Sequence, residues 1–160
     1  MTRSLALLAL TLSALIFGFF YAWTCSTMWG LDAADPRVAI AAMQAMNASV
    51  RNAVFAPAFF GTAPALLLVA LLARENRPAA LLFAAAGVVY GLLGMGLTLM
   101  VNVPMNQALA VTPIPDDLAA AQAIWTEYSG RWQVWNQTRT FTSGVAFLLA
   151  ALGHARLGAA

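Results

Sequence analysis

The stretch Thr98-Leu-Met-Val-Asn102-Val-Pro104-Met-Asn106 closes a long apolar segment and decides how the whole chain is interpreted. Asparagine often caps the C-terminus of a helix, and a proline shortly afterwards commonly stops it. We therefore expect an apolar helix to end at about residue 101 and the chain to leave a membrane there. Asn106 is not needed for this capping role, so its carboxamide needs another partner.

The composition assigns the chain to the integral membrane proteins. Of its 160 residues, 62% are hydrophobic and only 9% are charged, and the mean hydropathy is +0.78. A soluble domain carries about 25% charged residues. The basic residues stand singly between apolar runs, whereas nucleic-acid binding requires a clustered patch, so we expect no nucleic-acid partner.

Four apolar runs reach the length of about 20 residues that a membrane-spanning helix needs. We place these helices at about residues 5–29, 53–73, 79–101 and 139–157. Helical patterns at 36–51 and 118–135 predict short interfacial helices, although the second one is also compatible with a helix that runs straight into the last span. The expected fold is all-α: one integral membrane domain over residues 1–160, a four-helix bundle with short interfacial helices on the non-cytoplasmic side.

The arginines set the expected orientation. Four fall on each side of the predicted membrane, so the short loop that holds Arg74 and Arg77 decides the positive-inside rule. We expect a multi-pass protein of the cell membrane with both termini in the cytoplasm.

Polar side chains gather where the predicted helices meet the non-cytoplasmic face. Isolated polar groups near hydrocarbon are costly, so these side chains should converge on one pocket at that end of the bundle. They are Asn47, Arg51, Asn102, Asn106, Asn136 and Arg139.

An aromatic seam leads into the last span. Trp125, Tyr128, Trp132, Trp135 and Arg139 follow one another at steps of three or four residues, so they share one helical seam. Such rings either anchor a helix at the membrane interface or line a pocket for a flat aromatic molecule. For Trp132 and Trp135, both readings stay open.

The sequence offers no familiar cofactor or metal motif. Cys25 is the only cysteine. His154, the only histidine, lies at the end of the last predicted span that is opposite to the polar cluster. No His, Cys and carboxylate set has metal-ligand spacing, and no Ser-His-Asp arrangement or Gly-rich phosphate loop occurs. We therefore expect neither a metal site nor a cofactor.

Three segments are read together: Met43-Gln44-Ala-Met46-Asn47, Asn102-Val-Pro104-Met-Asn106 and Trp125-xx-Tyr128-xxx-Trp132-xx-Trp135-Asn136-xx-Arg139-Thr140. Their combination resembles the DUF1772 or anthrone oxygenase-like family. The resemblance implies a small four-helix membrane protein, and some members are linked to the oxidation of anthrones to anthraquinones without a recognised metal or flavin. The positions that match the family's motifs, and to which the resemblance assigns a site role, are Asn47, Asn102, Asn106, Trp132, Trp135, Asn136 and Arg139.

Two functions follow as hypotheses. The first is a cofactor-independent oxygenase-like enzyme for a flat, anthrone-type substrate. Arg139, Asn136 and Asn102 would stabilise its developing oxyanion. The substrate-binding residues would be Asn47, Arg51, Asn106, Trp132 and Trp135. No general base is evident near this set. The alternative is a non-catalytic membrane protein that binds a lipid or quinone-like molecule or serves as a partner subunit. A homo-oligomer is compatible with either hypothesis.

Overall fold

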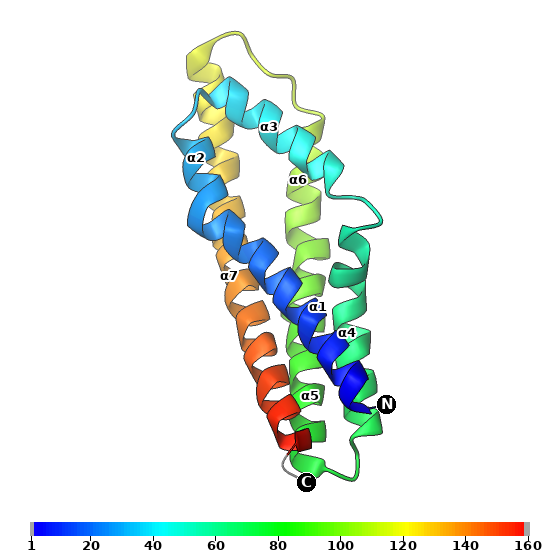
Figure 1. Ribbon diagram of the computed structural model, residues 1–160. Coiled ribbons are helices and arrows are strands. Elements are labelled where there is room, and N and C mark those ends of the chain that lie inside the picture. Colours follow the sequence, from blue (N-terminus) through cyan, green and yellow to red (C-terminus); the bar gives the residue numbers. More distant parts are fainter. Residues whose placement is uncertain (1, 159–160) are drawn as a thin grey trace.

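The computed structural model describes residues 2–158, which form helices and short connections and contain no strand within that range (Figure 1). Four helical stretches are long and apolar enough to cross a membrane. The all-α membrane bundle expected from the sequence is therefore confirmed. Residue 1 and residues 159–160, the ends of the predicted domain, lie outside the described part.

The first half of the chain forms two of these stretches. α1 (Thr2–Ala22), a π-helical turn (Trp23–Thr27) and α2 (Met28–Asp32) follow one another without a break. α3 (Pro36–Ser49) is the short helix predicted near residues 36–51, and α4 (Phe55–Leu72) is the second spanning stretch.

The third stretch is longer than expected. α5 (Arg77–Val89) continues through two π-helical turns (Tyr90–Gly96 and Thr98–Asn102) into α6 (Val103–Ala110). The expectation that the helix ends at about residue 101 is therefore wrong. α7 (Leu118–Gly158) is a single helix, so the continuous alternative is the one that residues 118–135 adopt.

The backbone at Asn102 explains why the third stretch does not stop there. Asn102 has helical angles (φ −67°, ψ −38°) and does not act as a C-terminal cap. Pro104 lies in the first turn of α6, directly after a π-helical turn. A π-helical turn already interrupts the regular four-residue hydrogen-bond ladder, so the missing N–H of Pro104 removes little.

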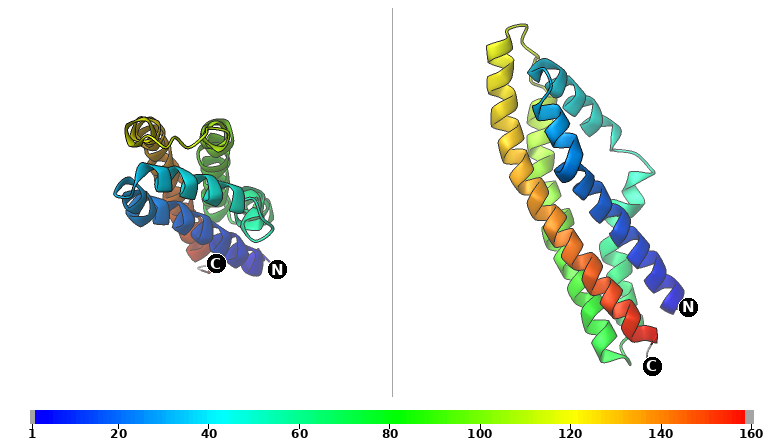
Figure 2. Two further views of the ribbon diagram at one scale, coloured as in Figure 1. Left: turned by 90° about the horizontal axis from the view of Figure 1, so that it is seen from above. Right: turned by 60° about the vertical axis from the view of Figure 1, so that its left-hand side comes forward.

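The helices pack as a bundle that α3 covers at one end. Figure 2 shows α3 lying across the bundle when it is seen from above, and both termini lie at the opposite end. Small residues permit close helix contact in membranes. At Gly87 of α5, an added Cβ would lie 2.8 Å from the side chain of Leu67 in α4, so only glycine fits there without a shift.

Two apolar clusters fill the interior. The terminal-side cluster is formed mainly by α1, α4, α5 and α7 and includes Phe20, Phe59 and Phe83. The α3-side cluster joins α2, α3 and α7 and includes Met43 and Trp132. Phe19 packs against both clusters, so the boundary between them lies beside it.

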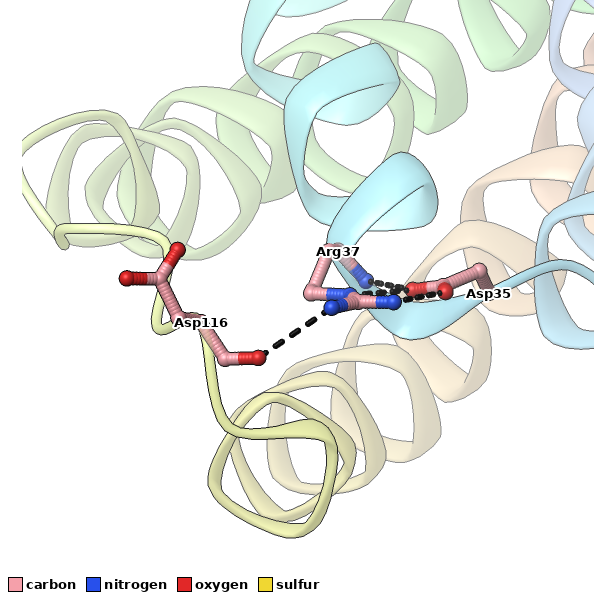
Figure 3. A network of polar contacts seen from close by, with 3 residues as sticks. All are labelled: Asp35, Arg37 and Asp116. Carbon is pink, nitrogen blue, oxygen red and sulfur yellow. Dashed lines mark hydrogen bonds and ion pairs between the residues drawn. The ribbon is translucent and has the colours of Figure 1, made fainter.

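An ion pair fixes the start of α3 outside the spanning helices (Figure 3). Asp35 caps α3 by accepting from the backbone N–H of Arg37 at 2.9 Å, and the Arg37 guanidinium binds the same carboxylate at 2.6 Å. Hydrogen bonds from Arg37 lower the pKa of Asp35 to about 2. Arg37 also donates to the carbonyl of Asp116 at 3.1 Å, which ties α3 to the connection before α7.

Candidate functional site

A cavity of about 550 Å³ lies at the boundary between the two clusters. This volume falls in the range of small-molecule sites, about 300–1,000 Å³. Aromatic rings make up much of its wall, and α1, α3, α4, α7 and the Thr98–Asn102 turn all contribute to it. The aromatic lining residues are Phe19, Phe20, Trp23, Phe55, Phe59, Phe60 and Trp132.

Arg139 supplies a buried cation to this cavity. Its side chain lines the cavity, although the residue is only 5% exposed. Nε and Nη2 donate to Oδ1 of Asn136 at 3.0 and 2.8 Å, and Nη1 donates to the hydroxyl of Thr98 at 3.4 Å. Between residues 2 and 158, the ion pairs are Arg37–Asp35 and Arg74–Glu75, so Arg139 has no carboxylate partner there.

Aromatic faces stabilise the Arg139 guanidinium in place of an acid. Its central carbon lies 4.3 Å from the ring centroid of Phe20 and 4.9 Å from that of Trp132. Cation–π contacts of this kind contribute about 2 kcal/mol when desolvated. The rings hold the charge without neutralising it, so an anion in the cavity would still find an unpaired cation.

Asn136 orients Arg139 from the adjacent turn of α7. Its Nδ2 donates to the carbonyl of Phe20 at 3.2 Å and to the hydroxyl of Thr24 at 2.8 Å. These donations leave Oδ1 facing the guanidinium. The π-helical turn of the first stretch thus fixes which way the Asn136 amide points.

Three polar side chains close the α3 side of the cavity, and three hydrogen bonds join them in a ring. Asn106 donates to Oδ1 of Asn47 at 2.9 Å, Asn47 donates to the Tyr128 hydroxyl at 3.4 Å, and Tyr128 donates back to Oδ1 of Asn106 at 2.8 Å. The same Asn106 oxygen accepts from Nε1 of Trp132 at 2.9 Å. The ring therefore also fixes the indole that stacks on Arg139.

The structure brings most of the predicted site residues together. Asn47, Asn106, Trp132 and Arg139 line the cavity, and Arg51 lines its exposed rim. Asn136 contacts the cavity through Arg139.

Two predicted residues lie elsewhere. Trp135 does not line this cavity and is 36% exposed, because it sits about 60° around the helix from Trp132. Asn102 is fully buried behind the lining, one turn beyond Thr98, and both polar atoms of its side chain have no hydrogen-bond partner. Neither residue is among those that line the cavity.

The sequence assigned no site role to Thr98 or Phe20, and it placed Tyr128 only among the seam rings that either anchor a helix or line a pocket. Tyr128 and Thr98 carried a signal, because one belongs to the aromatic seam and the other begins the polar stretch at the end of the third apolar run. Phe20 carried none, because one phenylalanine within an apolar run looks like any other.

The acidic residue nearest in sequence to the first π-helical turn is not available as a base. Oδ1 of Asp32 accepts from Trp125 at 2.9 Å and Ser129 at 2.7 Å, and Oδ2 accepts from Gln133 at 2.8 Å. Asp32 does not line the cavity and instead clamps α2 to α7. Within residues 2–158, no three His, Cys, Asp or Glu side chains gather to form a metal site.

Comparison with known proteins supports the resemblance seen in the motifs. The family model described as anthrone oxygenase matches residues 45–149, a range that includes the predicted site residues. No curated protein and no solved structure matches the chain. With four apolar helices of spanning length and a family match over most of its sequence, the chain is a membrane protein that belongs to the anthrone oxygenase family.

Proposed function

We propose that the protein is an oxygenase-like enzyme that acts on a flat aromatic substrate of the anthrone type. One observation carries the proposal: the Arg139 guanidinium lies in an aromatic-lined cavity and has Asn136 and Thr98, but no described carboxylate, as its partners. Removing a proton from an anthrone places negative charge on its carbonyl oxygen. A buried cation with fixed hydrogen-bond partners is suited to stabilise that oxyanion.

The anion then reacts with molecular oxygen as the second substrate. The ring carbon that lost its proton adds O₂, and protonation of the product gives a hydroperoxide. Loss of the remaining C–H proton together with hydroxide leaves a second carbonyl group and one molecule of water. In this scheme, the protein's part is to bind the ring between Phe20, Trp132 and the other aromatic walls and to hold the oxyanion at Arg139.

The origin of the anion follows from the lining. The cavity residues within 2–158 include two arginines and no Asp, Glu or His. A substrate that enters neutral and ionises once bound, releasing its proton to water, fits this charge pattern, since Arg139 lowers the free energy of the bound anion and thereby the pKa of the bound substrate. The same charge pattern also suits the non-catalytic alternative, in which an acidic quinone-like molecule binds and is not converted.

Oxygen consumption separates these two functions. Purified protein in lipid nanodiscs is given a dihydroxyanthrone, and both oxygen uptake and quinone absorbance are followed. Empty nanodiscs measure spontaneous oxidation, and Arg139→Gln removes the cation while keeping a hydrogen-bonding side chain. We expect wild-type protein to raise the rate by at least about 100-fold over the variant, because oxyanion contacts contribute that much to turnover. Equal rates for wild-type protein, variant and empty nanodiscs would refute catalysis.

We also propose that residues 1–160 act as one membrane domain with the termini in the cytoplasm and α3 on the outer side. The support is the short turn with Arg74 and Arg77 at the end that holds both termini. In a Cys25→Ser background, an impermeant thiol reagent added outside should label Asp116→Cys and not Arg77→Cys. The reverse pattern would invert the topology.

A further inference from the structure

The exposed residues of the cavity lining mark where it opens. Phe60 of α4 is 54% exposed and Leu99 is 43% exposed, whereas Phe20, Trp132 and Arg139 are buried. The other exposed lining residues belong to the connection between α3 and α4. They are Arg51, Asn52 and Ala53. The cavity is therefore closed toward α1 and α7 and open between α4 and the Thr98–Asn102 turn.

The path of α4 creates this opening. α4 packs along α1 and α5 but has no comparable contact with the Thr98–Asn102 turn or α6. Figures 1 and 2 show that α4 begins below the level of α6, so the upper part of the α5–α6 stretch lies beside α3 rather than beside α4. Phe60 and Leu99 thus flank a gap between two spanning stretches.

The chemistry of the rim indicates what the gap faces. Phe60 and Leu99 are large apolar side chains whose exposure suits hydrocarbon. Arg51 and Asn52 lie at the end covered by α3, where arginine side chains reach the headgroup region. This order of side chains suits a gap that faces hydrocarbon at Phe60 and Leu99 and has its polar rim at the interface.

We propose that the gap between Phe60 and Leu99 is a lateral portal, through which the cavity takes an apolar aromatic ligand from the hydrocarbon phase of the membrane. The ligand passes between Phe60 and Leu99 and meets Arg139 at the closed end. The nature of the natural ligand rests on the proposed function. The access route does not, because it depends only on the placement of these side chains.

Cysteine labelling tests the portal without any anthrone, so its failure is distinct from failure of the proposed function. Thr98→Cys in a Cys25→Ser background places a thiol at the closed end, beside Arg139. Protein in liposomes is treated with pyrenyl maleimide, which partitions into the bilayer, or with a sulfonated methanethiosulfonate, which stays in water. Relative to a water-exposed reference, Asp116→Cys, we expect the apolar reagent to label Thr98→Cys at least about 10-fold faster than the anionic one. The positive charge of Arg139 would favour the anionic reagent, so this order cannot arise from electrostatic attraction.

Variants of the rim make the test specific. Leu99→Ala and Phe60→Ala should each speed labelling by the apolar reagent about 10-fold, and Leu99→Trp should slow it by a similar factor. Leu92→Ala, a 66% exposed leucine on the same stretch that does not line the cavity, should leave the rate unchanged. Size-exclusion chromatography shows that each variant is folded. The portal is refuted if the anionic reagent labels as fast as the apolar one, if neither reagent labels, or if Leu99 and Leu92 variants behave alike.

Discussion

The small hydroxyl side chains beside the terminal-side cluster and the carboxamides around the cavity are hydrogen-bonded in opposite ways. Ser13 donates to the carbonyl of Ala9 at 2.8 Å and Thr62 to that of Ala58 at 2.6 Å, each within its own helix. Around the cavity, by contrast, Asn47, Asn106 and Asn136 each bond to another element. Hydroxyls that bond within their own helix would be satisfied in a lone helix, whereas the asparagines need the assembled bundle.

This difference shows where the chain departs from a simple membrane bundle. Small residues and apolar side chains suffice to pack the terminal-side cluster. The cavity end adds a buried cation, a closed hydrogen-bonded ring of Asn47, Asn106 and Tyr128, and two of the π-helical turns, Trp23–Thr27 and Thr98–Asn102. π-Helical turns inside α-helices occur often at functional sites. The costly features of the fold are therefore concentrated beside the cavity.

The largest predicted effect is the loss of the Asn136 amide. Asn136→Leu leaves Nε and Nη2 of the buried Arg139 without an acceptor, so we expect a loss of about 3 kcal/mol in unfolding free energy. Gln137→Leu is the matched control, because it removes the same group from an exposed neighbouring position. Thermal unfolding in detergent compares the two. Equal effects would mean that Arg139 does not depend on Asn136.

A smaller effect is expected for the ring of hydrogen bonds. Tyr128→Phe removes the hydroxyl that joins Asn47 to Asn106, and the expected loss is about 1 kcal/mol. Trp132 should also become more mobile, which time-resolved tryptophan anisotropy detects. Tyr21→Phe, at an exposed position, serves as the control. If Tyr21→Phe destabilises the protein as much as Tyr128→Phe does, the ring of hydrogen bonds has no structural role.

Beside the terminal-side cluster, removing a hydroxyl should matter least among these changes to the bundle. Thr62→Val keeps the shape of the side chain and removes a bond to a carbonyl that already belongs to the helix ladder. We expect a change of no more than about 0.5 kcal/mol in unfolding free energy by the same thermal measurement. A loss as large as that of Asn136→Leu would erase the contrast between the two regions.

The smallest expected effect is the loss of the Asp35 cap at the start of α3 at low pH. Arg37 lowers the pKa of Asp35 from 3.8 to about 2. The ionised Asp35 therefore stabilises the start of α3 fully above pH 3.8, and this stabilisation is lost as the pH falls through about 2. The backbone N–H of Arg37 donates to the Asp35 carboxylate. At pH 3 this N–H should therefore exchange with solvent more slowly in the wild-type protein than in Asp35→Asn. If protection in the wild-type protein is already lost well above pH 3.8, Asp35 is not held ionised by Arg37.

Sequence reasoning predicted the bundle, and five of its eight candidate site residues line the cavity, for physical reasons. Apolar runs of spanning length determine membrane helices, and the cost of burying lone carboxamides predicts that Asn47, Asn106 and Asn136 find partners. Helix ends were harder to predict. At Asn102 and Pro104, a usual stop signal was overridden by a π-helical turn, which has no clear sequence pattern.

Side-chain direction was the other limit. Steps of three and four residues put Trp132 and Trp135 on one broad seam, yet about 60° separates them, enough to place one in the cavity and the other toward the outside. The stacking of Arg139 on Phe20 depends on contact between α7 and α1, two helices that lie far apart in the chain. No local pattern contains that information.

The most direct test of the central claim is the pH dependence of ligand binding at Arg139. A dihydroxyanthraquinone, which does not oxidise further, is titrated into wild-type protein and Arg139→Lys in nanodiscs, and quenching of tryptophan fluorescence reports Kd. We expect wild-type binding to tighten as the ligand's phenol ionises, because Arg139 then binds an anion. Lys lacks the planar fork that bonds Asn136, so its Kd should be about 10- to 100-fold higher. Equal Kd values with the same pH profile in both proteins would show that Arg139 does not bind the oxyanion.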